Sequence, residues 1–261
     1  MSQTASPSTV VTAAMLAIGD ELLSGRTKDK NISHLADVLT LAGIDLKEVR
    51  IVSYEEEAIV EALNALRGRY TYVFTSGGIG PTHDDITADS ISRAFGLPCV
   101  HDPDAMQLLA EMYQRREMEF TEARQRMARM PKGARHIANP VSTAPGFIVE
   151  NVYVMAGVPQ VFQAMLDNVL PELRTGSKML SCAIACPFGE GDIGTPLAAI
   201  QKAHPQTSIG SYPKYDGKRF STEIVVRARE QAEVDAAVAD VQQMVQDLEE
   251  KHLAPNGTAD A

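Results

Sequence analysis

Apolar positions in the first half of the chain follow two alternating spacings. Short apolar or β-branched runs predict buried strands, and they lie at 15–19, 49–53 and 70–75. Between these runs, apolar residues recur every three or four positions, which predicts amphipathic helices over 32–42, 55–66 and 86–95. Strands that alternate with helices of this length indicate βαβ units. The expected fold is therefore α/β, with three layers and a doubly wound, mainly parallel sheet.

The pattern then changes to two longer helical stretches and a pair of short strands. Helical spacing predicts helices over 103–118 and 121–130. Two apolar runs on either side of Asn151 predict a hairpin-like pair of strands. A last helix over 161–170 ends near Pro171, because proline disrupts the helix interior.

A polar stretch without periodicity at 172–178 predicts a boundary between a first domain over 12–172 and a second over 178–252. The second domain is expected to be a small α+β domain of order β-α-β-β-α. Thr195 and Pro196 predict the N-cap and first residue of a short helix that ends at Ala203. Asp216-Gly217 predicts the turn of a hairpin, and a valine stripe predicts the last helix.

Composition and charge narrow the class of partner. The net charge is −10 with a pI near 5.1, which argues against a general binder of nucleic acid or of an anionic membrane. The more basic segment 115–132 reads as one solvated face of an amphipathic helix. No run approaches the roughly 20 apolar residues of a membrane span, and the first residues do not resemble a secretory signal. With three scattered cysteines, a cytoplasmic protein with reduced core thiols is expected.

Two loops carry the candidate chemistry. One follows the first predicted strand and contains Asp20 and Glu21, and the other is the sequence TSGGIGPTHDDIT after the third predicted strand, at 75–87. In a doubly wound sheet the first strand usually lies beside the third, and a crevice opens at their carboxyl ends. If that order holds, Asp20 and Glu21 lie across one cleft from the glycines and from Asp84 and Asp85.

The second loop combines groups that attract and repel anions. Gly77, Gly78 and Gly80 allow backbone N–H groups to approach a phosphate, whereas Asp84 and Asp85 repel it. A Mg²⁺-like cation bridging phosphate and carboxylate oxygens resolves the conflict. Simpler interpretations stay open: the glycines can form only a turn, Asp84 can cap the next helix, and His83 can face solvent. The loop is neither a Walker P-loop nor a dinucleotide fingerprint.

At this point several motifs together resemble a known family. They are Gly19-Asp20-Glu21-Leu22, the loop 75–87, Asn139-Pro140, Ala144-Pro145-Gly146-Phe147 and Gly157-Val158-Pro159. Residues 12–172 resemble the molybdopterin-binding (MoaB/Mog-like) domain of the competence/damage-inducible protein A (CinA) family. The second domain, with IGSYPK at 209–214, is similar to the small domain that follows it in that family.

The resemblance implies a metal-dependent nucleotide pyrophosphatase that acts on ADP-ribose or a related nucleotide diphosphate such as FAD. The alternative is a non-hydrolytic molybdopterin- or nucleotide-binding module related to molybdenum cofactor biosynthesis proteins. Asp84 and Asp85 are the implied catalytic and metal-binding pair, with Mg²⁺ or a similar cation and no tightly bound organic cofactor. The implied nucleotide- and phosphate-binding residues are Gly19, Asp20, Glu21, Thr75, Ser76, Gly77, Gly78, Gly80, Thr82, Pro145 and Gly146.

Three further expectations accompany the resemblance. A homo-oligomer is expected, most often a dimer, because symmetric dimers are the commonest soluble assemblies. Long family members carry a nicotinamide-nucleotide amidase domain, which has no counterpart in this sequence, so that activity is not expected. The sequence also departs from the family at two positions: Val161 occupies a usual glutamate position, and Ser142 stands where glycine is common.

Overall fold

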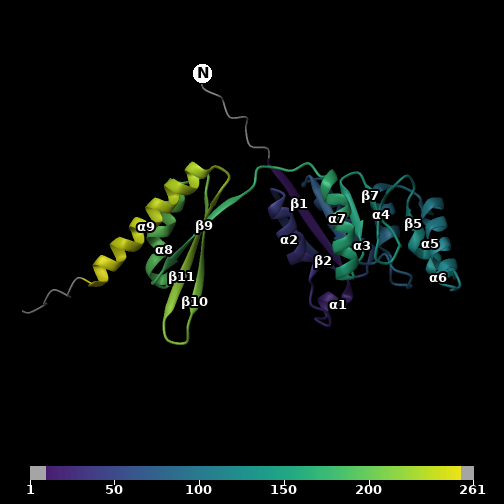
Figure 1. Cartoon of the computed structure of the whole chain (residues 1–261), viewed down its shortest axis with the longest axis horizontal. Coiled ribbons are helices and arrows are strands. Elements are labelled where there is room, and N and C mark those ends of the chain that lie inside the picture. The colour runs from purple at the N-terminus through teal and green to yellow at the C-terminus, as the bar shows by residue number, and fades with distance from the viewer. Residues whose placement is uncertain (1–9, 254–261) are drawn as a thin grey trace, which may run out of the picture. The chain divides into compact units, whose positions relative to one another are not determined.

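The computed structural model describes residues 10–253. Its chain divides into two compact units between residues 176 and 177 (Figure 1). Within the described residues, no helix is both long enough and apolar enough to cross a membrane. Each unit has its own hydrophobic core, so the two are described separately.

The first unit is built on a six-stranded sheet of order β2-β1-β3-β8-β7-β6. Its strands are β1 (Val11–Ile18), β2 (Ile44–Val52), β3 (Tyr72–Ser76), β6 (Arg135–Ile137), β7 (Gly146–Val149) and β8 (Val152–Met155). The first four strands in this order pair in parallel, and β7 and β6 add an antiparallel edge. The expected adjacency of the first and third strands is confirmed, because β1 and β3 pair directly with Ala17 opposite Ser76.

Helices cover both faces of this sheet, which confirms the three-layer α/β fold. One face packs against α2 (Asn31–Leu41) and α7 (Pro159–Val169). The other packs against α3 (Glu56–Arg67), α4 (Thr87–Phe95) and α5 (Pro103–Arg115). Central strand β1 is buried along almost its whole length, and its sequence VTAAMLAI is correspondingly apolar rather than alternating, as expected for a strand covered on both sides.

The expected helix over 121–130 is wrong, and so is the interpretation of 115–132 as one amphipathic helix. The segment forms the short helix α6 (Glu122–Gln125), the 3₁₀ turn η1 (Arg126–Ala128) and strand β5 (Arg129–Pro131), which pairs antiparallel with β4 (Cys99–His101). Phe120 folds back to stack on Tyr113 of α5, with ring centroids 5.5 Å apart. Thr121 then caps the new short helix. Ala128 and Met130 are both buried, but they belong to the 3₁₀ turn η1 and to strand β5 and not to one face of a helix.

The second unit has the expected order β-α-β-β-α. It contains β9 (Leu180–Cys186), α8 (Glu190–Ala203), β10 (Ser208–Tyr215), β11 (Phe220–Ala228) and α9 (Gln231–Leu253). The three strands form an antiparallel sheet of order β10-β11-β9. The hairpin turn forms as expected, because Asp216 Oδ1 accepts hydrogen bonds from the backbone N–H groups of Lys218 and Arg219 and Gly217 takes a left-handed conformation with φ +92°.

Helix α8 starts earlier than expected. The sequence predicts Thr195 as its N-cap, but the N-cap is Gly189 and Pro196 lies inside the helix. Ile193 and Leu197 are buried four residues apart on the helix face that packs on the core, and burial of Ile193 favours the additional N-terminal turn. That apolar packing outweighs the backbone hydrogen bond that Pro196 removes.

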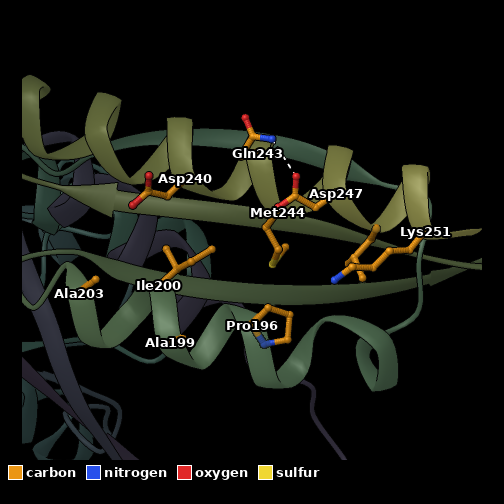
Figure 2. A pocket seen from close by; sticks show the side chains of 10 residues that line it. Pro196, Ala199, Ile200, Ala203, Asp240, Gln243, Met244, Asp247 and Lys251 are labelled. Atoms are coloured by element: carbon orange, nitrogen blue, oxygen red, sulfur yellow. Dashed lines mark hydrogen bonds between the residues drawn. The ribbon is translucent and has the colours of Figure 1, made fainter.

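Helices α8 and α9 leave a groove between them, with a volume of about 450 Å³ (Figure 2). Met244 of α9 and Ile200 of α8 project into it from opposite sides. Asp247 accepts a hydrogen bond from Gln243 one turn earlier. The groove has apolar walls and a few surface charges, without a glycine loop or a cluster of carboxylates. This groove therefore lacks the combination of glycines and carboxylates that marks the loop at 75–87 in the first unit.

Candidate functional site

A cavity of about 460 Å³ opens at the carboxyl ends of the parallel strands in the first unit. The loops after β1, β2, β3 and β8 contribute to its wall, and so do the loop before β7 and the 3₁₀ turn η1. Of the residues implied by the sequence, Glu21, Gly77, Gly78, Gly80 and Asp85 line it. The two loops singled out by the sequence thus meet at one cavity, at the edge where open α/β sheets usually bind ligands.

The glycine loop has no room for side chains at its first two positions. Gly77 has φ +108°, and a Cβ atom there would lie 2.2 Å from the Ile18 carbonyl oxygen of β1. At Gly78, with φ +69°, it would lie 2.1 Å from Thr87 Oγ1. Thr87, fully buried in the first turn of α4, donates to the Gly77 carbonyl at 3.0 Å, and its N–H donates to the Gly78 carbonyl at 3.0 Å. The loop is therefore fixed between β1 and α4.

Thr82 brings the two aspartates together. Its hydroxyl lies 2.5 Å from Asp84 Oδ1 and 2.6 Å from Asp85 Oδ2, and its backbone N–H donates to Asp85 Oδ2 at 2.8 Å. The hydrogen bond from Thr82 lowers the pKa of Asp84, with smaller contributions from the Asp84 backbone N–H and from His83. Asp85 lines the cavity, while Asp84 is more exposed on the outer side of the loop.

Two of the simpler interpretations are settled by this geometry. Asp84 does not cap the following helix, since the N-cap position of α4 is Ile86 and no side chain caps it. His83 does face solvent, with 98% of its side chain exposed. Neither interpretation therefore involves Asp85, which lines the cavity.

Tyr54, which follows β2, is a cavity residue that the sequence did not reveal. Burial is the first cause that raises its pKa to about 12, and the negative charges of Glu21, Asp85, Asp84 and Asp20 raise it further. Four carboxylates from two loops thus act on one phenol, which shows that the loops converge electrostatically as well as geometrically. Among the described residues that line the cavity there is no lysine, arginine or histidine.

Titration of Tyr54 tests this electronegative environment. Its folded-state pKa of about 12 lies above the ordinary value of 10.0, so deprotonation favours the unfolded chain. The stability that Tyr54 contributes is therefore fully present below pH 10 and lost as the pH rises through 12. The difference in tyrosinate absorbance between wild type and Tyr54→Phe is expected to titrate near pH 12, and at lower pH in a Glu21→Gln background. A midpoint at the ordinary value would contradict the arrangement.

Asn31, the first residue of α2, ties two of the lining loops together. Its side-chain amide donates to Ser76 Oγ at 2.7 Å and to the Gly157 carbonyl at 2.8 Å. Within residues 10–253, its own Oδ1 and the Thr75 hydroxyl are buried without a hydrogen-bond partner. Thr75 and Ser76 therefore stand at the end of β3 behind the glycine loop, and neither lines the cavity itself.

The other residues implied by the sequence have positions outside the cavity wall. Gly146 belongs to β7, where a Cβ atom would lie 2.4 Å from the Val154 carbonyl oxygen, so packing within the sheet requires this glycine. Pro145 beside it is buried. The backbone N–H of Gly19 donates a hydrogen bond to the Val52 carbonyl at 3.0 Å. Asp20 is exposed in the short helix α1 (Asp20–Leu23).

The loop carboxylates could hold a cation only together with other ligands, such as waters or phosphate oxygens. Within residues 10–253, no group of three or more acidic, histidine or cysteine side chains has metal-site geometry. The Asp84 and Asp85 carboxylates, however, both reach the Thr82 hydroxyl. Mg²⁺ is commonly bound through one or two carboxylates, with waters and substrate phosphates completing its octahedron. The pair fits that kind of site.

Each of the two units matches a known protein family. A family described as "Probable molybdopterin binding domain" matches residues 14–175, and one described as "FAD synthase, middle domain" matches residues 178–252. A protein from Caldivirga maquilingensis is 38% identical over 166 residues, which cover 62% of this chain and 65% of that protein. A CinA-like protein from Citrifermentans bemidjiense is 43% identical over 165 residues, which cover 61% of this chain and 40% of that protein.

A solved structure agrees with this assignment. The crystal structure of the protein CinA with unknown function from Thermoplasma acidophilum is 28% identical, with a TM-score of 0.58, and the match covers 62% of this chain and 98% of that one. The chain thus spans less than two thirds of both curated relatives and nearly all of this solved chain. On the match over residues 14–175, the chain belongs to the molybdopterin-binding (MoaB/Mog-like) domain family, with CinA-like proteins among its relatives.

Proposed function

We propose that this protein is a metal-dependent nucleotide pyrophosphatase that hydrolyses ADP-ribose or a related nucleotide diphosphate such as FAD. The observation that carries the proposal is the position of Asp85 beside a glycine loop that admits no side chain, at one cavity. A loop of this kind brings backbone N–H groups close to an anion. Carboxylates at the same place favour an anion that arrives with a cation.

Two helix starts give the cavity a positive contribution that its side chains lack. Helix α4 follows the glycine loop and has no side-chain cap, and α7 begins at Pro159, which lines the cavity together with Val158. The N-terminal end of a helix carries partial positive charge. Both helix starts therefore favour phosphate at this edge of the sheet.

The remaining wall suits the rest of a nucleotide. Apolar side chains of Ile79, Met127, Val158 and Val161 line the cavity together with the ring of Tyr54. A mostly apolar wall with a few polar groups is typical of small-molecule sites. Val161, where the family usually has glutamate, extends this apolar wall and removes one charge that would repel an anion.

In the proposed reaction, water attacks one phosphorus of the diphosphate and the bridging P–O bond breaks. ADP-ribose then gives AMP and ribose 5-phosphate, and FAD gives AMP and FMN. Asp84 and Asp85 would hold a Mg²⁺-type cation, which offsets the negative charge that develops on the phosphoryl oxygens. Thr82 orients both carboxylates, and the fixed loop between β1 and α4 holds the diphosphate in one position.

A second function uses the same residues without turnover. The family name over residues 14–175 and the FAD synthase match over 178–252 both support binding of a nucleotide or pterin. A non-hydrolytic molybdopterin- or nucleotide-binding module would need the glycine loop and the apolar wall. It would not need a water molecule placed for attack.

An assay of AMP release separates the two functions. Purified protein is incubated with ADP-ribose or FAD and with Mg²⁺ or Co²⁺, and AMP is quantified by chromatography. AMP that accumulates over many turnovers, and that stops when EDTA removes the cation, is the expected result. Binding of the same nucleotides without any AMP release would favour the binding module instead.

A further inference from the structure

The side chains around the cavity are negatively charged, and so is the diphosphate of the proposed substrate. Glu21 and Asp85 line it, and no cationic side chain does so among the described residues. Opposite charge must nevertheless lie nearby for a diphosphate to bind well. The helix starts supply part of it, and the 3₁₀ turn η1 carries a cationic side chain next to the cavity residue Met127.

Arg126, the first residue of η1, contacts the aspartate loop directly. Its Nη2 donates to the backbone carbonyl of Asp85 at 3.3 Å. The next residue, Met127, lines the cavity. A guanidinium therefore lies against the loop at the border of the site, although residues 85 and 126 are distant in sequence.

The interactions of Arg126 differ from those of its arginine neighbours. Arg124 lies over the Tyr113 ring at 4.6 Å, and Arg129 forms an ion pair with Asp89. Within residues 10–253, Arg126 has no carboxylate partner, and its Nε is buried without a hydrogen-bond acceptor. A buried donor that lacks an acceptor calls for an explanation, such as a group that arrives with a ligand.

We propose that Arg126 is a positioning residue for anionic ligands at this cavity. It holds the Asp85 carbonyl, which fixes the loop, and its charge offsets the repulsion between the loop carboxylates and a phosphate-bearing ligand. A guanidinium is less strongly hydrated than an ammonium group, which suits a partly buried site. The ligand class, a nucleotide with a diphosphate, rests on the proposed function.

Three variants separate charge from packing. Arg126→Gln removes the charge but keeps a side-chain amide that can donate to the Asp85 carbonyl, Arg126→Lys keeps the charge, and Arg124→Gln is the control in the same segment. Calorimetry measures the affinity for ADP with Mg²⁺ and, separately, for adenosine, which has no phosphate. Loss of one charge contact is expected to weaken ADP binding about tenfold in Arg126→Gln. Adenosine affinity is expected to change less than about twofold, since an uncharged ligand gains little from the arginine.

The ADP affinities of the other two variants show whether the charge of Arg126 is what matters. Arg126→Lys is expected to bind ADP within about threefold of wild type, because it keeps the charge. Arg124→Gln is expected to match wild type, because its partners lie elsewhere. High salt should weaken ADP binding more in wild type than in Arg126→Gln, a difference that a purely structural role does not produce.

Unchanged ADP affinity in Arg126→Gln, or an equal loss for ADP and adenosine, would overturn the proposal. Melting temperatures of all variants show whether each one folds. If wild type releases no AMP yet binds ADP in an Arg126-dependent way, the pyrophosphatase proposal fails and this one stands. If AMP release is present and Arg126→Gln binds and turns over substrate like wild type, this proposal fails alone.

Discussion

Asp85→Asn is expected to reduce metal-dependent AMP release by at least about a thousandfold while the protein stays folded. The amide retains an oxygen that can accept from the Thr82 backbone N–H, but it loses the charge that the cation requires. Asp84→Asn is expected to have a smaller effect, since Asp84 does not line the cavity. Steady-state AMP release and thermal unfolding measure the two parts of this prediction.

Asp104→Asn is the matched control, because Asp104 is an exposed aspartate in the first turn of α5, away from the cavity. It is expected to keep full activity. Both loop variants should melt within a few degrees of wild type, since a change on an exposed loop usually costs little. Wild-type activity in both Asp85→Asn and Asp84→Asn would remove these carboxylates from the proposed chemistry.

Gly77→Ala is expected to destabilise the protein by roughly 3 kcal/mol or more, or to displace the loop and abolish nucleotide binding. Two costs combine at this position. A left-handed conformation costs a non-glycine residue about 1–2 kcal/mol, and the new methyl group would also overlap the Ile18 carbonyl oxygen. Ile18 belongs to the buried central strand β1, so the overlap cannot be relieved by a surface movement.

Gly96→Ala is the matched control for backbone conformation alone. Gly96 ends α4 with φ +64°, and nothing lies within 4 Å of the position of its Cβ. Its expected cost is therefore about 1 kcal/mol. Urea unfolding of the two variants measures the difference. If Gly77→Ala were as stable as Gly96→Ala and bound nucleotide normally, the close approach of the loop to β1 would be disproved.

Periodicity predicted most of the fold where one side-chain pattern dominates. Strand β1 and helices α2, α3 and α4 are recognisable because each buries a continuous run or a stripe against a core. Periodicity does not predict the segment 121–130, because the chain changes there within ten residues from helix α6 to the 3₁₀ turn η1 and then to strand β5. The sequence predicts too short a helix α8, because Thr195-Pro196 is a local N-cap signal whereas the burial of Ile193 depends on tertiary packing.

The candidate site was predictable only where its residues are contiguous in sequence. The loop 75–87 carries its glycines and aspartates in one motif, so its chemistry could be anticipated. Tyr54 lines the same cavity and Arg126 contacts the same loop, but both come from elements distant in sequence. Neither residue stands in a sequence motif that would indicate a role at the site. Tyr54 could have been found from topology, since it follows a strand that ends at the same sheet edge as β1. Arg126 lies in the segment 121–130, where the structure replaces the predicted helix with short elements.

Isotope transfer from water tests the central claim most directly. The protein is incubated with ADP-ribose and Mg²⁺ in ¹⁸O-water, and the products are analysed by mass spectrometry. Attack of water on phosphorus predicts one ¹⁸O atom in the phosphate of either AMP or ribose 5-phosphate, with no product in EDTA or with Asp85→Asn. Product that forms at the same rate in EDTA, or that carries the label on a sugar carbon instead of a phosphate, would contradict metal-dependent hydrolysis of the diphosphate at this loop.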